Sequence, residues 1–199
     1  MGRKSAKKTR KPITKKVTIW LGDLLICLQH EKIEQMSIDD LARLAGKSKS
    51  TLYEYFESKE EVILAACTNK IKGIENNLIQ KQPSKNPIKL YQQLVEVFAE
   101  GTSEISLAFL QGIKLHYPTS WLTIETFTNK FIDLLKEQYT KGINEGLYTQ
   151  INVELLGQID KLFISQVVTN PAIFTDTKYK LSELIRDYLN LRLHGLIKK

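Results

Sequence analysis

The sequence has few of the residues that build disulfide-linked, metal-binding or membrane-spanning proteins. Its 199 residues include only 2 cysteines and 3 histidines, and none of them has a metal-binding spacing. Cys27 and Cys67 both lie in apolar surroundings, so we expect buried thiols in a reducing compartment. No apolar run approaches the roughly 18–20 residues that cross a bilayer, and the basic start has no apolar stretch typical of a secretory signal. These absences favour a cytoplasmic protein without a metal site or cofactor.

Glycine and proline are also sparse, at 10 and 5 residues. Strand-like alternation of β-branched residues is absent, and almost every segment repeats its apolar residues with a helical period. The sequence therefore predicts an all-α fold with about nine helices. The apolar patterns of these helices cover 17–28, 38–45, 49–56, 59–80, 88–100, 104–115, 122–139, 155–167 and 181–192, with a linker at 81–86.

Two short helices after residue 37 carry clear start and stop signals. Ser37 with Asp40 three residues later is a capping-box pattern. Gly46 is the residue best able to end that helix in the left-handed conformation, and Ser48 can cap the next one. Three short helices in about 40 residues, the last two joined by so tight a turn, are typical of a helix-turn-helix.

In that motif the second helix of the pair lies in the major groove of DNA. Leu52 and Phe56 share one face of this helix and are expected in the core. The outer faces and leading end then carry residue types that hydrogen-bond phosphates or base edges. These residues are Lys49, Ser50, Thr51, Tyr53 and Tyr55.

The string from Ser37 to Glu61 resembles the N-terminal domain of TetR-family transcriptional regulators. Its specific elements are Ile-x-x-Leu-Ala, Ala-Gly before the turn, Ser-x-x-Thr-Leu-Tyr-x-Tyr-Phe, and the Ser-Lys-Glu-Glu that follows. The resemblance covers residues 14–66, and the rest of the chain fits the family only by helix count and length. It implies a basic tail at 1–13, a DNA-binding domain at 14–60, and a helical effector-binding and dimerisation domain at 61–199.

The resemblance also implies which residues contact DNA. Ser37 and Lys59 match backbone contacts, and the residues on the second helix match groove and phosphate contacts. The predicted DNA-binding residues are Ser37, Arg43, Lys47, Ser48, Lys49, Ser50, Thr51, Tyr53, Tyr55 and Lys59. Three positions depart from the family: Lys32 replaces a usual glycine, Asp39 replaces a frequent arginine, and Lys47 fills a usually apolar turn position. Packing roles for the two tyrosines and a plain surface role for Lys59 are the alternatives.

Positive charge is concentrated at the start of the chain. Lysine and arginine total 29 against 22 acidic residues, a net charge of +7, and eight of the basic residues fall within residues 1–22, which hold no acidic one. Residues 38–59 instead carry four basic and four acidic side chains, so the predicted helix-turn-helix itself has no net charge. The tail is either a solvated arm or an arm that follows phosphates or the minor groove.

The last two helices carry strongly apolar stripes. They either cover their own domain's core or, as the resemblance implies, pair with a second copy in a four-helix bundle. A homodimer also suits a palindromic operator read by two recognition helices. The predicted dimer-interface residues are Leu155, Leu156, Ile159, Leu162, Phe163, Leu181, Leu184, Ile185 and Tyr188.

Residues 87–147 are expected to form an effector chamber, because this span is rich in aromatic residues and ligand pockets are mostly apolar. Most of these aromatics belong to an ordinary core in the alternative interpretation. The predicted lining is Phe98, Phe109, His116, Tyr117, Trp121, Phe127 and Phe131.

The resemblance thus implies a one-component repressor that leaves a palindromic operator in double-stranded DNA when a small, largely apolar ligand binds. An enzyme is disfavoured because no nucleophile elbow, phosphate loop or metal spacing is present. The alternative is a general binder of nucleic acid or anionic surfaces that acts through its basic tail.

Overall fold

A computed structural model describes residues 10–80, 84–170 and 180–198. These residues form an all-α fold with one isolated antiparallel bridge, between Tyr148 and Ile197. The helices found in them are α1 (Lys15–Leu28), α2 (Ile38–Leu44), α3 (Lys49–Tyr55), α4 (Lys59–Gln80), α5 (Pro87–Thr102), α6 (Leu107–His116), α7 (Pro118–Asn144), α8 (Val153–Thr169) and α9 (Leu181–Leu196). The predicted fold class is confirmed. Residues 1–9 of the predicted tail and 81–83 of the predicted linker lie outside the described residues.

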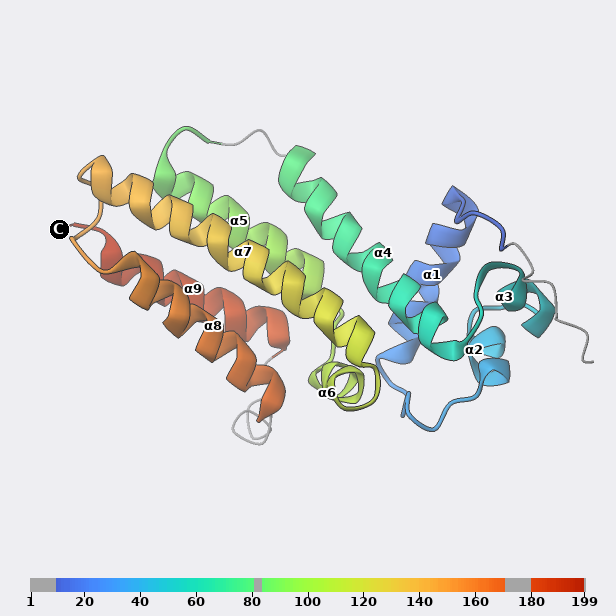
Figure 1. The fold of residues 1–199 in the computed structure, drawn as a ribbon. Coiled ribbons are helices and arrows are strands. Elements are labelled where there is room, and N and C mark those ends of the chain that lie inside the picture. Colours follow the sequence, from blue (N-terminus) through green and yellow to red (C-terminus); the bar gives the residue numbers. More distant parts are fainter. Residues whose placement is uncertain (1–9, 81–83, 171–179, 199) are drawn as a thin grey trace, which may run out of the picture.

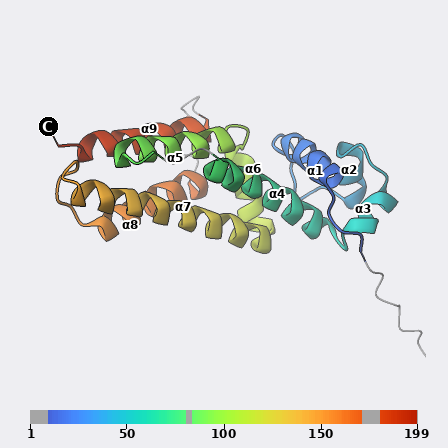
Figure 2. The same cartoon turned by 90° about the horizontal axis from the view of Figure 1, so that it is seen from above.

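The helices are arranged in two groups along an elongated molecule (Figure 1). Helices α1, α2 and α3 form a small unit at one end, and α5, α7, α8 and α9 run side by side at the other (Figure 2). Helix α4 belongs to both groups, because it packs on α1 at its start and on α5 and α7 further along. The short α6 lies between the two units. No break in the chain marks the predicted boundary at residue 60, since α4 runs through it.

The ends of α2 confirm the predicted start and stop signals. Ser37 accepts a hydrogen bond from the Asp40 amide, and the Asp40 carboxylate accepts one from the Ser37 amide, which completes the capping box. Gly46 has φ +61°, and the Lys47 amide donates to the carbonyl of Ala42 at 2.9 Å. This is the Schellman ending, which requires a left-handed residue and so favours glycine. The tight turn into α3 is therefore encoded locally.

Backbone hydrogen bonds join the turn after α7 to the segment after α9 at the far end of the molecule. The Thr149 amide donates to the Leu196 carbonyl, and the Lys198 amide donates to the Leu147 carbonyl. Tyr148 is 1% exposed there, and its ring lies directly against Gly142. A Cβ at Gly142 would come within 2.1 Å of that ring, so the sequence needs glycine at this close approach.

A cluster of buried polar side chains links four helices of the larger unit. Asp160 of α8 is 0% exposed. Its carboxylate accepts hydrogen bonds from the Tyr139 hydroxyl of α7 and the Tyr188 hydroxyl of α9, both at 2.7 Å. Arg192 Nε lies 3.3 Å from the same carboxylate. The Tyr91 hydroxyl of α5 lies 3.4 Å from that of Tyr139 and donates to the Leu189 carbonyl. We call these residues the Asp160 cluster.

Two expectations about local structure were wrong. Cys27 is exposed, because α1 turns it away from the core, whereas Cys67 is buried as predicted. Helix α6 begins at Leu107 rather than at 104, because Ser106 caps it by accepting from the Phe109 amide. Among the described residues, no helix is both long and apolar enough to cross a membrane.

Candidate nucleic-acid interface and ligand chamber

Helix α3 is held against α1 by its two predicted core residues. Leu52 is 0% exposed and Phe56 4%. The Phe56 ring meets Trp20 of α1 edge to face at a centroid distance of 6.0 Å. With that face buried, the remaining faces of α3 point outward, as a recognition helix requires.

The leading end of α3 presents three hydroxyl groups and one lysine. Ser48 caps the helix by accepting from the Thr51 amide, and its hydroxyl lies 2.9 Å from that of Ser50 and 2.8 Å from that of Thr51. Ser48, Lys49 and Ser50 are exposed, and Thr51 is half-buried. The structure therefore brings these four predicted residues together on one accessible surface.

Acidic side chains of α2 pair with the basic residues of this surface. Lys49 Nζ lies 2.8 Å from Asp39 Oδ2, and Arg43 Nη2 lies 3.1 Å from Asp40 Oδ1. Hydrogen bonds from Ser37 and then from Arg43 lower the pKa of Asp40 to about 2. The hydrogen bond with Asp39 raises the pKa of Lys49.

The trailing end of α3 is joined by the chain that precedes α1. The Lys11 amide donates to the Glu54 carbonyl, Lys11 Nζ lies 2.8 Å from Glu54 Oε2, and Arg10 donates to the Tyr53 carbonyl. Tyr53 is half-buried, and so is Tyr55, whose ring packs against Phe56 and the core. Arg10 and Lys11 of the basic segment thus contact the C-terminal end of the predicted recognition helix.

Two further predicted DNA-binding residues, Lys47 and Lys59, donate hydrogen bonds to backbone carbonyls of the protein. Lys47 is half-buried and its ammonium donates to the Gly46 carbonyl. Lys59 donates to the Met36 carbonyl at 2.9 Å, and its ammonium lies 5.5 Å from the centre of the Tyr117 ring. Lys59 therefore also ties α4 to the loop before α2 and to the larger unit.

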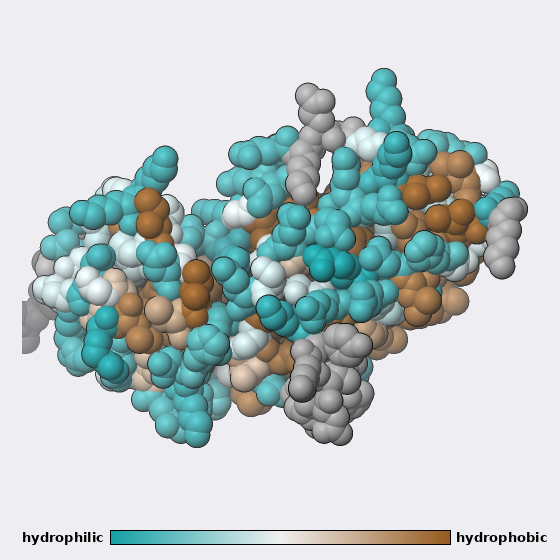
Figure 3. All heavy atoms as spheres, turned by 180° about the vertical axis from the view of Figure 1, so that it is seen from behind, coloured by the Kyte–Doolittle hydropathy of each residue, from teal (hydrophilic) through white to brown (hydrophobic). Residues whose placement is uncertain are grey.

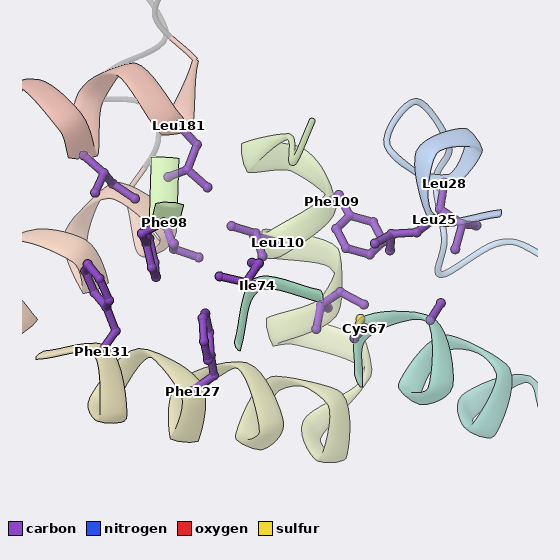
Figure 4. Packing of buried hydrophobic residues seen from close by; sticks show 14 of the residues in the cluster. Leu25, Leu28, Cys67, Ile74, Phe98, Phe109, Leu110, Phe127, Phe131 and Leu181 are labelled. Carbon is purple, nitrogen blue, oxygen red and sulfur yellow. The ribbon is translucent and has the colours of Figure 1, made fainter. Parts of the chain in front are cut away.

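A mostly apolar cavity of about 130 Å³ is lined by the helices of the larger unit together with α4, α6 and one residue of α1. Phe98, Phe109, Leu110 and Phe127 surround it from three helices (Figure 4). Its remaining lining comes from Leu25, Cys67, Lys70, Ile71, Ile74, Thr102, Ile105, Trp121, Ile124, Glu125, Thr128, Asn129, Lys161, Ile164, Ser165, Val168, Leu181 and Ile185. We call this cavity the chamber.

The structure places four of the seven predicted lining residues in the chamber: Phe98, Phe109, Trp121 and Phe127. His116 is exposed at the end of α6, so its prediction was wrong. Tyr117 is buried but donates to the Ile33 carbonyl instead. Phe131 stacks on Phe98 at 4.1 Å, behind the lining. The chamber also extends beyond residues 87–147, because α1, α4, α8 and α9 supply walls that periodicity within one segment does not reveal.

Helix α6 connects the chamber to the smaller unit. Phe109 and Leu110 line the chamber, while the residues at the two ends of α6 bond to the segment between α1 and α2. The Ser106 amide donates to Gln29 Oε1 at 2.8 Å, and the Tyr117 hydroxyl donates to the Ile33 carbonyl at 2.8 Å. These two hydrogen bonds thus link α6, which lines the chamber, to the chain that leads into α2.

Helices α8 and α9 leave an apolar surface uncovered. Leu155, Ile159 and Leu162 are exposed along one face of α8, and Leu191 of α9 is 74% exposed. Figure 3, which is seen from the side of α5 and α9, shows apolar side chains at the end of the molecule away from α3 as well as some over the smaller unit. Leu184, Phe163 and Tyr188 are half-buried beside them, and the last two stack with centroids 3.8 Å apart. Leu191 was missed, although it lies seven residues after Leu184 in the same helical stripe.

Three residues predicted for a dimer interface lie elsewhere. Leu156, Leu181 and Ile185 are at most 5% exposed, and the last two line the chamber. The same apolar stripes thus serve two purposes: one side of each helix covers its own core, and the other side is accessible.

Comparisons with known proteins agree with the geometry of the small unit. Residues 27–66 match the family described as bacterial regulatory proteins, tetR family. The fatty acid metabolism regulator protein of Bacillus subtilis (strain 168) is 24% identical over 172 residues, which are 83% of this chain and 87% of that protein.

Solved structures share the fold over nearly the whole chain. The TetR family transcriptional regulator PfmR from Thermus thermophilus superimposes with a TM-score of 0.66 and 25% identity, covering 90% of this chain and 99% of that one. The transcriptional regulator FadR from Bacillus subtilis in complex with stearoyl-CoA gives a TM-score of 0.60 at 19% identity, covering 89% and 98%. Residues 27–66 therefore match the tetR family of bacterial regulatory proteins, and the described part of the chain shares the fold of a solved TetR family transcriptional regulator.

Proposed function

We propose that this regulator is a one-component repressor that binds a specific palindromic operator and releases it when a largely apolar ligand enters the chamber. The observation that carries the proposal is the position of α6, which lines the chamber with Phe109 and bonds to the DNA-binding unit through Ser106 and Tyr117. We take Ser37 and the predicted residues of α3 as the operator contacts, and residues 61–199 as the effector-binding and dimerisation domain.

The size of the chamber suggests how ligand binding lowers operator affinity. Ligand pockets for drug-sized molecules measure roughly 300–1,000 Å³, whereas this chamber measures about 130 Å³. A drug-sized ligand can therefore enter the chamber only if the surrounding helices move apart. It then binds the expanded shape better than the closed one, and this difference in affinity is what lowers operator affinity.

We propose that the effector carries a long acyl chain. The walls are apolar except for a few polar groups, among them Glu125, Lys161 and Lys70, the last of which pairs with Glu104, and such walls suit a hydrocarbon chain. The Bacillus subtilis relative is a regulator of fatty acid metabolism, and the structural neighbour with 19% identity holds stearoyl-CoA. Stearoyl-CoA is therefore the first probe.

The proposal is tested by fluorescence anisotropy on an operator selected from random DNA. Stearoyl-CoA should release the operator, and coenzyme A alone should not. Ile124→Trp, which places an indole in the chamber, should bind the operator normally but resist release. Leu122→Trp is the matched control because that residue lies on the outer face of α7, 61% exposed. Release of Ile124→Trp as efficient as that of the unchanged protein would refute the chamber as the effector site.

The proposed DNA contacts of α3 are tested separately. Thr51→Ala and Tyr53→Ala should abolish a sequence-specific footprint, whereas removal of residues 2–12 should weaken binding and flatten its salt dependence by roughly 0.9 per lost phosphate contact. A footprint that survives in Thr51→Ala but vanishes with the tail would favour a general binder that acts through its basic tail.

We also propose that two copies of the chain pair through α8 and α9. The accessible stripe of Leu155, Ile159, Leu162 and Leu191 is the apolar face that a four-helix bundle would bury. Two recognition helices in a symmetric dimer then read two half-sites about one helical turn apart.

A further inference from the structure

Asp39 lies on the DNA-facing surface, where a carboxylate is electrostatically unfavourable. It occupies the first turn of α2 and reaches across the turn to Lys49, the first residue of α3, with Nζ and Oδ2 2.8 Å apart. The side chains of Lys49 and Asp39 remain 48% and 63% exposed, so the pair is open to solvent and to an approaching duplex. DNA phosphates and Asp39 therefore compete for the same ammonium group.

The fold does not require this pair. An ion pair so exposed contributes little to stability, and neither side chain belongs to the core. The neighbouring acid of α2, Asp40, is different because it closes the capping box and pairs with Arg43 within its own helix. Asp39 is thus the acid of α2 whose contact reaches the recognition helix.

The pair restricts Lys49 in a way that differs between the two kinds of DNA complex. Non-specific binding relies on phosphate contacts, so Lys49 must leave Asp39 to contribute to it. In an operator complex the pair can stay closed, since two donors of the ammonium remain free for guanine acceptors and Asp39 Oδ1 can accept from cytosine. Breaking the pair is then a cost of non-specific binding alone.

We propose that Asp39 is a specificity-determining residue, which holds Lys49 for base contacts and withholds it from phosphates on non-operator DNA. This inference rests on the sequence-specific DNA binding proposed above. The carboxylate acts through Lys49, so it is a positioning residue whose effect must vanish when Lys49 is neutral.

The test compares Asp39→Asn with the unchanged full chain on a selected operator and on random-sequence duplex of equal length, over a range of salt concentrations. On random DNA, Asp39→Asn should bind about two- to fivefold more tightly, the cost of an exposed ion pair. Its salt slope should steepen by up to about 0.9 for the added phosphate contact. Operator affinity should rise less or fall, so the ratio of the two affinities drops.

Three controls make the result specific. Asp23→Asn removes the same charge from α1, where Asp23 lies beside Lys70 and Glu104 rather than α3, and should leave the ratio unchanged. Asp39→Glu should retain the ratio. In a Lys49→Gln background, Asp39→Asn should leave the ratio of the two affinities unchanged, because the coupling between the two residues is then lost. Thermal melts of each variant confirm that it is folded.

Other outcomes overturn the inference. If Asp39→Asn tightens both complexes equally, the carboxylate only repels DNA in general; if neither affinity changes, the pair has no role. If the unchanged protein selects no preferred sequence, the proposed function fails and this inference fails with it. A preferred sequence combined with an unchanged affinity ratio defeats the inference alone.

Discussion

The Asp160 cluster permits a quantitative prediction for Tyr139→Phe. This change removes one buried hydroxyl that donates to the Asp160 carboxylate at 2.7 Å and leaves the ring in place. A hydrogen bond to a charged group contributes about 1.5–3 kcal/mol, more than a neutral one. The carboxylate keeps Tyr188 and the nearby Arg192, so we expect a loss of about 2 kcal/mol rather than collapse of the cluster.

The assay is urea unfolding and thermal denaturation at one fixed protein concentration, because association would also shift the midpoint. A chain of this length loses about 2–4 °C in Tm per kcal/mol, so Tm should fall by about 4–8 °C. Tyr53→Phe is the matched control: none of the described residues is seen to hydrogen-bond its hydroxyl, and the change should stay within about 0.5 kcal/mol. Equal losses in the two variants would refute the role assigned to the Tyr139 hydroxyl.

Three further predictions concern the thiols, the capping box and the apolar face of α8. Iodoacetamide should label the exposed Cys27 quickly and Cys67 slowly, because burial raises the pKa of the Cys67 thiol to about 12. Stearoyl-CoA should slow the labelling of Cys67 further, since Cys67 lines the chamber. Equal labelling rates of the two thiols in mass spectrometry would contradict this prediction. The difference in unfolding free energy between the unchanged protein and Asp40→Asn should be full above about pH 4 and vanish as pH falls to about 2. The reason is that the pKa of Asp40 is lowered from 3.8 in the folded protein. Urea midpoints that differ equally at every pH would contradict this prediction. Leu162→Glu should shift sedimentation at micromolar concentration from dimer to monomer, whereas Leu122→Glu, at a nearly equal exposure, should not.

The features that could be predicted are those determined by a few neighbouring residues. The capping box of Ser37 and Asp40 and the left-handed ending at Gly46 depend on hydrogen bonds within about five residues. The inward face of α3 follows from the four-residue spacing of Leu52 and Phe56, although the helix that covers it, α1, is distant in sequence. The exposed faces of α3 could be predicted for a similar reason, since a short helix between two local signals exposes the faces that its core residues leave free; that these faces contact DNA stays a prediction.

The chamber could be predicted only in part, because its walls meet through packing of distant helices. Leu25, Cys67 and Ile185 enter it from α1, α4 and α9, and no local spacing distinguishes them from ordinary core residues. His116 was favoured because it is polar and lies beside aromatics, yet one turn of α6 directs it to solvent. Asp160 was missed, although an acid within the buried stripe of α8 is a usable signal of a polar cluster.

The contact between α5 and α9 has a consequence for the order of folding. Tyr91 of α5 donates to the Leu189 carbonyl of α9 across 98 residues of sequence, whereas the small unit is built from contacts among neighbouring helices. Low contact order favours early folding, and chains emerge from the ribosome N-terminus first. Helix α3 can therefore take its final shape on the nascent chain before α9 has been synthesised, so it forms earlier than the helices through which we propose that two copies pair.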